Sequence, residues 1–371
     1  MMEGDPFERG TWAIPVLVTN LAVLAFGTLY YIKKLPNFFR NSIKFILEFE
    51  VSRNVAIIVL VAIVFGYIGL GIEDLSIDEG KTYGDRLRVD RVVEKWPLNE
   101  DNAVGLMNRH VTNFLLKSSD VLFQNLRIIP FIASISFLIL TYFFTLEITK
   151  KRFAGLVATV ILFQSYNFQV FDTLAAYPNF WGLFYLLSLY LIFKKWQLSS
   201  ITYIVSIFAK PLTAIFFPMT LFFTYRAEMP RRKKIYITIS YAIIVVIMIL
   251  VVFGANVHLG GGSATGKIQF DYKEFWSGFT TWSYQLRFES LFLLFILPLT
   301  VGLFLTSRKG VPMADSMLVL IVGVILSMPL LAAMTGFNLH PYRYIPLIDF
   351  FAIGVATLLS KKSQTTGLKT V

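Results

Sequence analysis

The chain has 371 residues, of which 56% are hydrophobic, 16% are aromatic and only 15% are charged. Soluble globular domains carry about 25% charged residues. This composition excludes a water-soluble domain, a disordered chain and a coiled coil, and it indicates a polytopic membrane protein. Because the chain has no cysteine, disulfides, zinc–thiolate and iron–sulfur sites and a cysteine nucleophile are also excluded.

Apolar segments long enough to cross a membrane recur along the whole chain. A crossing helix needs about 20 mostly apolar residues. Residues 199–225 carry Lys210-Pro211 in their middle, and we expect two short spans there because proline removes a backbone donor and disfavours helix in the residue before it. The sequence thus predicts an all-α polytopic membrane protein with about 11 transmembrane helices, two of them short. The other spans are expected at roughly 12–32, 54–72, 128–148, 153–171, 177–193, 235–255, 289–306, 315–335 and 343–359.

The formal charge of +11 is explained by the orientation of these spans. If successive spans alternate in direction, 20 of the 34 basic residues fall in connections on one side of the membrane. The positive-inside rule makes that side cytoplasmic. We therefore expect the N-terminus outside, the C-terminus in the cytoplasm and no nucleic-acid partner. The connections assigned to the cytoplasm hold Lys33, Lys34, Arg40, Lys44 and Arg53, Lys150 to Arg152, Lys194 and Lys195, Arg226 and Arg231 to Lys234, Arg308 and Lys309, and Lys361, Lys362 and Lys369.

Three parts of the chain follow from this topology. Residues 1–53 are expected to form an extra N-terminal span and then a cytoplasmic interfacial helix, because apolar and charged residues alternate from 38 to 49. Residues 54–225 form the candidate catalytic core, with a long first external loop, 73–126, that contains interfacial helices. Residues 226–371 form a C-terminal membrane module whose external loop, 256–288, is rich in glycine and aromatic residues. These aromatic residues fit either an interfacial belt or a lid.

An acidic pair, Asp78-Glu79, follows the second predicted span by a few residues. A carboxylate just above the membrane can act as a general base toward a hydroxyl group within hydrogen-bond reach. Two neighbouring acids can equally be solvated loop residues. On the catalytic interpretation, Asp78 is the base and Glu79 orients it or the acceptor.

Short motifs follow this pair in a recognisable order. The order of these features resembles that of the GT-C membrane glycosyltransferases, in particular the branch of protein O-mannosyltransferases and lipid A aminoarabinose transferases. The resemblance covers roughly residues 70–225 and 337–359, and the chain lacks the proline that the family often has after the histidine at His110. The motifs are Asp78-Glu79, Leu126-Arg127-Ile128-Ile129-Pro130, Lys151-Arg152-Phe153-Ala154-Gly155, Phe171-Asp172 to Tyr177-Pro178, Phe208-Ala209-Lys210-Pro211 and Arg343-Tyr344-Ile345-Pro346-Leu347.

The resemblance implies an inverting glycosyltransferase that takes a sugar from a polyprenyl-phosphate donor, dolichyl or undecaprenyl. The acceptor, a glycan, lipid or protein, is then glycosylated at the outer membrane face. Cations at the ends of spans are expected to stabilise the charge that develops on the lipid phosphate as it leaves. The candidates are Lys210, Arg343, Arg127 and His340 for the donor phosphate, Asp78 and Glu79 for catalysis, and Asp172 as a second acid or a metal ligand.

Other interpretations remain open at this point. Lysine and arginine at span ends commonly extend to the lipid headgroups without any further role, and Asp172 can cap the helix that follows it. Asp78, Glu79 and Asp172 can supply oxygen ligands to Mg or Mn, or basic residues alone can neutralise the phosphate. A transporter or lipid flippase with an external binding vestibule is the main alternative function, and a non-catalytic assembly protein is another. The expected location is the cell membrane, although a luminal site in the endoplasmic reticulum would give the same pattern.

Overall fold

The computed structural model describes residues 13–77, 109–254, 270–311, 313–335 and 340–360. Within these ranges the regular structure is entirely helical, with no strand, so the predicted all-α fold is confirmed. The helices are α1 (Ala13–Tyr31), α2 (Asn37–Glu48), α3 (Arg53–Gly71), η1 (Glu73–Ser76), α5 (His110–Phe123), α6 (Ile128–Thr149), α7 (Arg152–Phe163), α8 (Tyr166–Val170), α9 (Phe180–Lys194), α10 (Trp196–Ala209), η5 (Pro211–Phe216), α11 (Phe217–Arg226), α12 (Arg231–Gly254), α13 (Tyr272–Gln285), α14 (Ser290–Arg308), α15 (Ala314–Thr335), η6 (Pro341–Tyr344) and α16 (Ile345–Thr357).

Several of these helices have the length and composition of membrane spans. Among the described residues, five segments are long and apolar enough to cross a bilayer: α1, α3 with η1, α6, α14 and α15. The shorter apolar helices are α7, α9 and α10. The chain is therefore a helical membrane protein.

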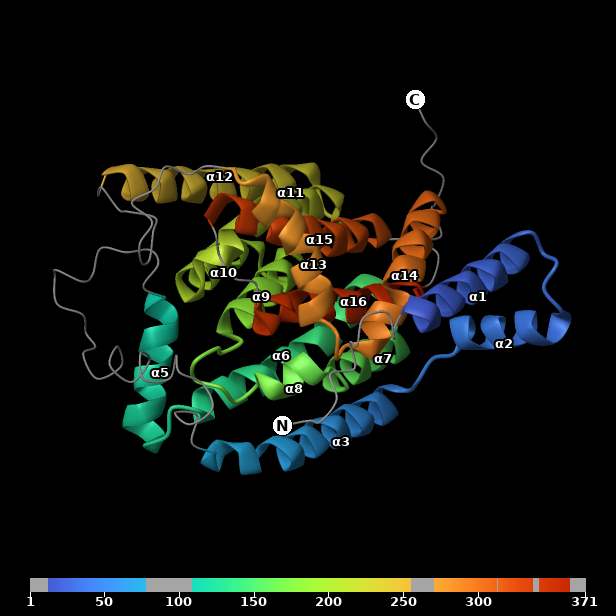
Figure 1. Cartoon of the computed structure of the whole chain (residues 1–371), viewed down its shortest axis with the longest axis horizontal. Coiled ribbons are helices and arrows are strands. Elements are labelled where there is room, and N and C mark those ends of the chain that lie inside the picture. Colours follow the sequence, from blue (N-terminus) through green and yellow to red (C-terminus); the bar gives the residue numbers. More distant parts are fainter. Residues whose placement is uncertain (1–12, 78–108, 255–269, 312, 336–339, 361–371) are drawn as a thin grey trace.

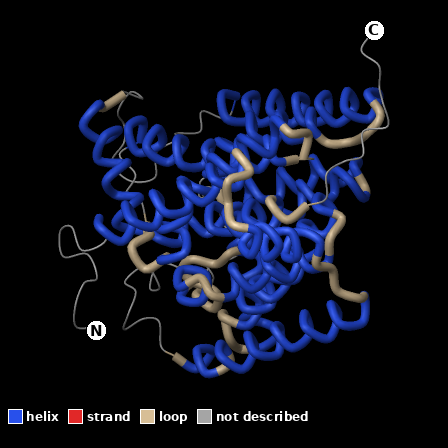
Figure 2. Tube along the Cα trace, turned by 90° about the vertical axis from the view of Figure 1, so that its right-hand side faces the viewer, coloured by secondary structure: helices blue, strands red, loops and turns tan. Residues whose placement is uncertain are grey.

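Helix α16 forms the centre of the bundle. All but one of its residues are buried, and it packs against α6, α7, α14 and α15. Figure 1 shows α12 and α11 along one edge of the bundle and α3 along the opposite edge, with α5 at the left end and α2 at the right end. Figure 2 shows the same helices from the side, as stacked layers joined by short connections. The polar contacts between helices lie mainly at the two ends of this bundle.

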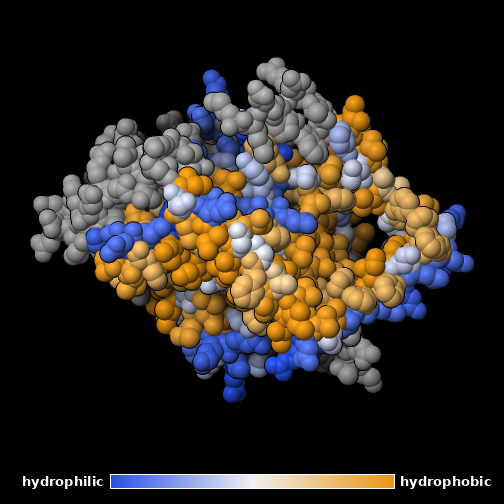
Figure 3. Space-filling model, turned by 90° about the horizontal axis from the view of Figure 1, so that it is seen from below, coloured by the Kyte–Doolittle hydropathy of each residue, from blue (hydrophilic) through white to orange (hydrophobic). Residues whose placement is uncertain are grey.

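The outside of the bundle is apolar, as expected of a surface in contact with lipid. Helix α3 exposes Ile58, Phe65 and Leu70 by more than 60% each, and α1 buries only Asn20. Figure 3 views the molecule from the side on which α3 lies, and hydrophobic residues cover most of that face. Exposed apolar surface of this extent marks an interaction site, here with the membrane.

Helix α2 is amphipathic and buries none of its residues. Phe38 and Phe45 are exposed on it, and Lys44 pairs with Glu48 along its polar side. These features fit the interfacial helix expected for this segment.

Two predicted segments have a different local structure from the one expected. Residues 153–171 form two helices, α7 and α8, instead of one span, because Ser165 stops the first helix and caps the second by accepting a hydrogen bond from the Phe168 N–H. In the aromatic segment of 256–288, residues 272–285 form helix α13. Gly278 of α13 lies directly on Pro329 of α15, where a Cβ atom would come within 2.7 Å of the proline backbone.

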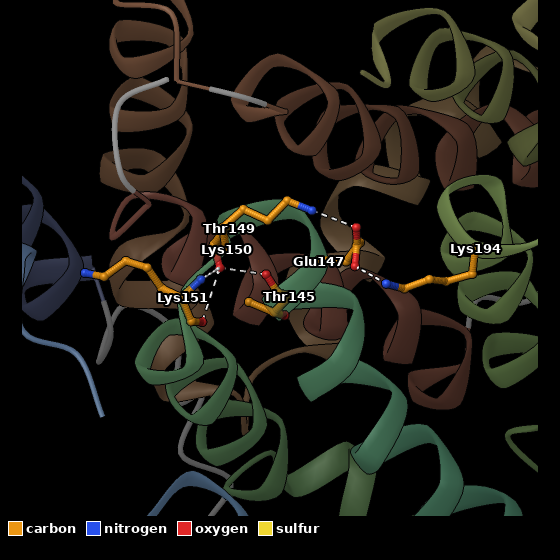
Figure 4. A network of polar contacts seen from close by, with 6 residues as sticks. All are labelled: Thr145, Glu147, Thr149, Lys150, Lys151 and Lys194. Atoms are coloured by element: carbon orange, nitrogen blue, oxygen red, sulfur yellow. Dashed lines mark hydrogen bonds and ion pairs between the residues drawn. The ribbon is translucent and has the colours of Figure 1, made fainter. Parts of the chain in front are cut away.

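At one end of the bundle the basic residues are paired. The Glu147 carboxylate accepts from Lys150 at 2.7 Å and from Lys194 at 2.6 Å (Figure 4). In the same turn between α6 and α7, Lys150 adopts a left-handed conformation and the Thr149 hydroxyl accepts a hydrogen bond from the Lys151 N–H. The ammonium of Lys151 is fully buried and donates to the Leu47 carbonyl at 2.7 Å.

Other contacts at this end join segments that lie far apart in sequence. The Arg152 N–H donates to the Glu50 carboxylate at 3.0 Å, and Arg226 pairs with Asp315. Residues assigned to the cytoplasmic side from charge alone therefore contact one another in space. We call this set of contacts, with those of Glu147 and Lys151, the paired end.

Candidate functional site

The opposite end of the bundle holds the five predicted site residues that the structure describes, in two groups. Asp78 and Glu79 lie outside the described residues, which stop one position earlier, at Ile77. Arg127 and Asp172, with Thr173, form one group of contacts. Lys210, His340 and Arg343 form a second group, around the ring of Tyr342.

Arg127 is buried and joins two loops. Its guanidinium donates hydrogen bonds to the Ile77 carbonyl at 2.8 Å, the Thr173 hydroxyl at 2.8 Å and the Thr173 carbonyl at 3.3 Å. Its backbone N–H donates to the side chain of Asn125. This geometry lets Arg127 fix the end of the 73–77 segment against the loop that carries Asp172, and the phosphate contact expected from the sequence stays a prediction.

Asp172 is almost fully buried in that loop. Its backbone carbonyl accepts from the Ser134 hydroxyl at 2.9 Å, and its carboxylate faces the hydroxyl of Tyr67, although no hydrogen bond of good geometry joins the two side chains. Burial first, and then the negative charge of nearby Asp74, raise the pKa of Asp172 to about 7, while the polar groups of Tyr67 and Thr173 act in the opposite direction. A carboxyl group with a pKa near 7 can exchange a proton at neutral pH.

Lys210 is held in a break between two helices. Helix α10 ends at Ala209, Lys210 is extended, and Pro211 begins η5 at a position where its missing N–H has no cost. The Lys210 carbonyl accepts from the backbone and the hydroxyl of Thr213, at 3.0 and 2.8 Å, which fixes the turn. The sequence prediction of two short segments meeting at Lys210 is consistent with this break.

The side chain of Lys210 lies between two aromatic rings. Its ammonium is 3.9 Å from the ring centroid of Tyr342 and 4.5 Å from that of Trp181. Each contact is a cation–π interaction, worth about 2 kcal/mol or more where the groups are desolvated. The residue is only 7% exposed, so this ammonium has left bulk water.

No acidic side chain balances this charge in the described part of the chain. The charged groups that act on Lys210 there are Arg343, which is itself 7% exposed, and Arg109 at the start of α5. Burial lowers the pKa of Lys210 well below its usual range, and the positive charges of Arg343 and Arg109 lower it further. A buried cation without a counter-charge is costly, so its presence needs an explanation outside the described contacts.

The ring of Tyr342 connects the cations to a set of aromatic side chains. Tyr177 stacks on it with centroids 4.3 Å apart, and His340, which is exposed, stacks on it at 5.8 Å. Phe171 packs at 5.8 Å from the same ring. The site therefore has buried cations within the bundle and an aromatic rim that reaches the surface at His340.

The described residues do not form a metal centre. They contain no group of three or more His, Cys, Asp or Glu side chains placed to hold an ion. Asp172 is the one member of the predicted acidic set that lies among them, and Asp78 and Glu79 lie outside. The expected Mg or Mn ion thus has no further support from the described geometry.

Trp181 and Tyr67 contribute to the site, and the sequence did not single them out. Trp181 lies in the first turn of α9, and nothing in the sequence places Lys210 against it. Tyr67 lies within an apolar predicted span, where a tyrosine is not distinguished from the surrounding packing residues. The structure shows it buried against Phe131 and Phe168 and beside Asp172.

The geometry suits the binding of an anion at a membrane surface. Lys210 and Arg343 supply positive charge inside a largely apolar enclosure, where electrostatic attraction is much stronger than in water. Trp181 and Tyr342 hold the ammonium in place. Comparison with known proteins adds no assignment: no protein-family model, curated protein or solved structure matches this chain.

Proposed function

We propose that the chain is an inverting glycosyltransferase that moves a sugar from a polyprenyl-phosphate donor to an acceptor at the outer face of the membrane. The observation that carries this proposal is the buried ammonium of Lys210, which lies beside Arg343 and has no acidic partner in the described part of the chain. A lipid phosphate supplies the missing negative charge. It would enter from the membrane, where the rest of such a donor is dissolved.

The chemistry assigned to each residue follows from this placement. A direct displacement needs one base, and we assign that role to Asp78, with Glu79 orienting the base or the acceptor. Lys210 and Arg343 stabilise the charge that develops on the leaving phosphate, a contribution of the kind that is worth about 100-fold or more in rate. Arg127 positions the segment that leads to Asp78 through its bond to the Ile77 carbonyl. Asp172 is a second acid with a proton to exchange near neutral pH.

The proposed topology has 11 crossings in a GT-C-like arrangement, with the N-terminus outside and the site facing outside. The contacts of the paired end support it, because residues that the charge rule puts in the cytoplasm lie together there. Residues expected on the outside, from Arg127 to Arg343, lie together at the other end. Helix α13 is then an external interfacial helix and not a crossing.

The alternative function is a transporter or lipid flippase that uses the same cations as a binding vestibule. Asp349 is an acid within the predicted span 343–359. It is almost fully buried in α16, and one of its oxygens accepts a hydrogen bond from the Thr141 hydroxyl at 2.7 Å. A transport mechanism would depend on such an intramembrane charge. The glycosyltransferase proposal instead assigns Asp349 a structural role, so Asp349→Asn separates the two functions.

The test is release of radiolabelled sugar from polyprenyl-phosphate donors by purified protein in lipid. We expect release by the wild type, loss of release with donor binding retained in Asp78→Asn, and weaker donor binding in Lys210→Gln. Lys195→Gln is the matched control, since Lys195 is exposed at the paired end. Equal release by wild type and Asp78→Asn would remove Asp78 from the mechanism. If no donor released sugar and the wild type instead transported a lipid-linked substrate that Asp349→Asn did not, the transporter proposal would replace this one.

A further inference from the structure

A second polar site lies away from Lys210, on the side of the bundle where α7, α14 and α16 meet. It is a small surface cavity of about 30 Å³, enough for a group the size of a water molecule or an ammonium. Six of its ten lining residues are apolar or aromatic, and the four polar ones are Gln164, Ser165, Glu289 and Ser290. The apolar lining residues are Ile161, Phe288, Leu291, Phe292, Ile348 and Phe351.

Glu289 is the buried acid of this cavity. Its Oε1 atom accepts from the Ser165 hydroxyl at 2.8 Å and from the Asn167 N–H at 2.7 Å, and this pair of bonds ties the start of α14 to the start of α8. The Oε2 atom has no hydrogen-bond partner within the described part of the chain, although the residue is only 6% exposed. One oxygen of the carboxylate is thus structural, and the other is available to a ligand.

Two further polar groups of the cavity are also available. The Gln164 amide and the Ser290 hydroxyl make no hydrogen bond with the described residues. Together with Glu289 Oε2, they provide three oxygen acceptors and one negative charge. A primary ammonium has three N–H donors and a positive charge, and therefore matches this set.

The position of the cavity suggests where the ammonium comes from. Gln164 ends α7 and Ser290 begins α14, so the polar groups lie at helix ends, while Ile348 and Phe351 line the cavity from within the bundle. The guanidinium of Arg287 lies 4.5 Å from the ring centroid of Phe288, another lining residue, and adds positive charge at the rim. An ammonium, an adjacent phosphate and an apolar tail are the parts of one common amphiphile, an ethanolamine phospholipid.

We propose that this cavity binds the ammonium of an ethanolamine phospholipid on Glu289, with the phosphate outside the cavity toward Arg287 and the acyl chains in the membrane. The site is separate from the donor site around Lys210 and does not depend on the glycosyltransferase proposal. It gives the chain a specific annular lipid at the point where α8 is fixed to α14. Trimethylation of the amine removes all three N–H donors, so phosphatidylcholine is the natural discriminating ligand.

Native mass spectrometry of the purified protein, released from micelles that contain equal amounts of phosphatidylethanolamine and phosphatidylcholine, tests the proposal. We expect the wild type to retain phosphatidylethanolamine at least tenfold over phosphatidylcholine, and Glu289→Gln to lose this preference. A glutamine still accepts the bonds from Ser165 and Asn167, so the fold is kept. Glu274→Gln, a change of an exposed acid on α13, is the matched control and should retain the lipid.

Ser290→Trp fills the cavity from an exposed position without changing the carboxylate, and we expect it to lose the lipid as well. Free ethanolamine added in excess should not displace the lipid, because it lacks the phosphate and the tail; displacement by it would overturn the lipid assignment. Equal retention of the two phospholipids by the wild type, or an unchanged preference in Glu289→Gln and Ser290→Trp, would overturn the site.

Discussion

The two ends of the bundle treat their charges in opposite ways. At the paired end, Lys150 and Lys194 share the Glu147 carboxylate, and the buried ammonium of Lys151 donates to the Leu47 carbonyl. At the other end, the ammonium of Lys210 is also buried, but among the described residues it contacts aromatic rings and is acted on by other cations. Charges at the first end hold segments of the fold together, whereas a buried charge with no described counter-charge, as on Lys210, lowers stability. Functional sites commonly carry such a cost in stability.

Replacing the two buried lysines should therefore have opposite effects on stability. Lys210→Met removes a buried charge that has no counter-charge among the described residues, and we expect the free energy of unfolding to rise by on the order of 1 kcal/mol while sugar release falls about 100-fold. Lys151→Met leaves the Leu47 carbonyl without its donor, and we expect stability to fall by about 1–3 kcal/mol. Thermal unfolding in detergent and the sugar-release assay measure both quantities. A loss of stability in Lys210→Met comparable to that in Lys151→Met would show that Lys210 is structural.

The comparison also shows what could be predicted from the sequence. Composition and charge asymmetry predicted a helical membrane protein and divided its charged residues into two groups, and the contacts follow that division. Local rules also located the helix break at Lys210-Pro211, because proline acts on its immediate neighbours. These features depend on hydropathy and on adjacent residues, which a single sequence contains.

The environment of each charge could not be predicted in this way. Lys151 and Lys210 are both lysines at helix ends, and only the packing of distant segments gives one a carbonyl and the other two rings. The contacts of Arg127 illustrate the same limit, because its acceptors, Ile77 and Thr173, are about 50 residues away in sequence. Helix α13 was expected as loop for a different reason: its high aromatic content is typical of a membrane interface in either conformation.

The pH dependence of stability should report on Asp172. Its pKa is raised from the usual value near 4 to about 7 in the folded protein, so the folded state binds a proton between about pH 4 and 7 that the unfolded state has released. The contribution of this group to stability is therefore complete below about pH 4 and is lost as the pH rises to 7, by a few kcal/mol at most. We expect the melting temperature of the wild type to fall relative to that of Asp172→Asn from pH 5 to pH 8. Parallel curves for the two proteins would show that Asp172 is ionised throughout this range.

The space around Asp172 can be tested by adding one methyl group. A Cβ atom on Gly71 would lie 2.6 Å from the ring of Phe131 and 3.5 Å from the carboxylate of Asp172. We expect Gly71→Ala to lower the free energy of unfolding by about 1–3 kcal/mol through overpacking. Gly69→Ala is the matched control on the same helix, because nothing lies within 4 Å of its added atom. Equal unfolding midpoints for the two variants would show that Phe131 and the Asp172 loop move aside without strain.

The smallest effect is expected at the paired end, from Glu147→Gln. The Glu147 side chain is 20% exposed, and its two lysine partners are 69% and 47% exposed, so solvent screens both ion pairs. We expect a loss of about 0.5–1 kcal/mol in the free energy of unfolding, which shrinks as salt is added, and no change in sugar release. If this substitution instead reduced sugar release by as much as Lys210→Met, charge at the two ends would be coupled through the bundle. The division into a structural end and a functional end would then fail. A partly exposed ion pair at the paired end can affect sugar release only through a change of conformation that α16 and its neighbours transmit.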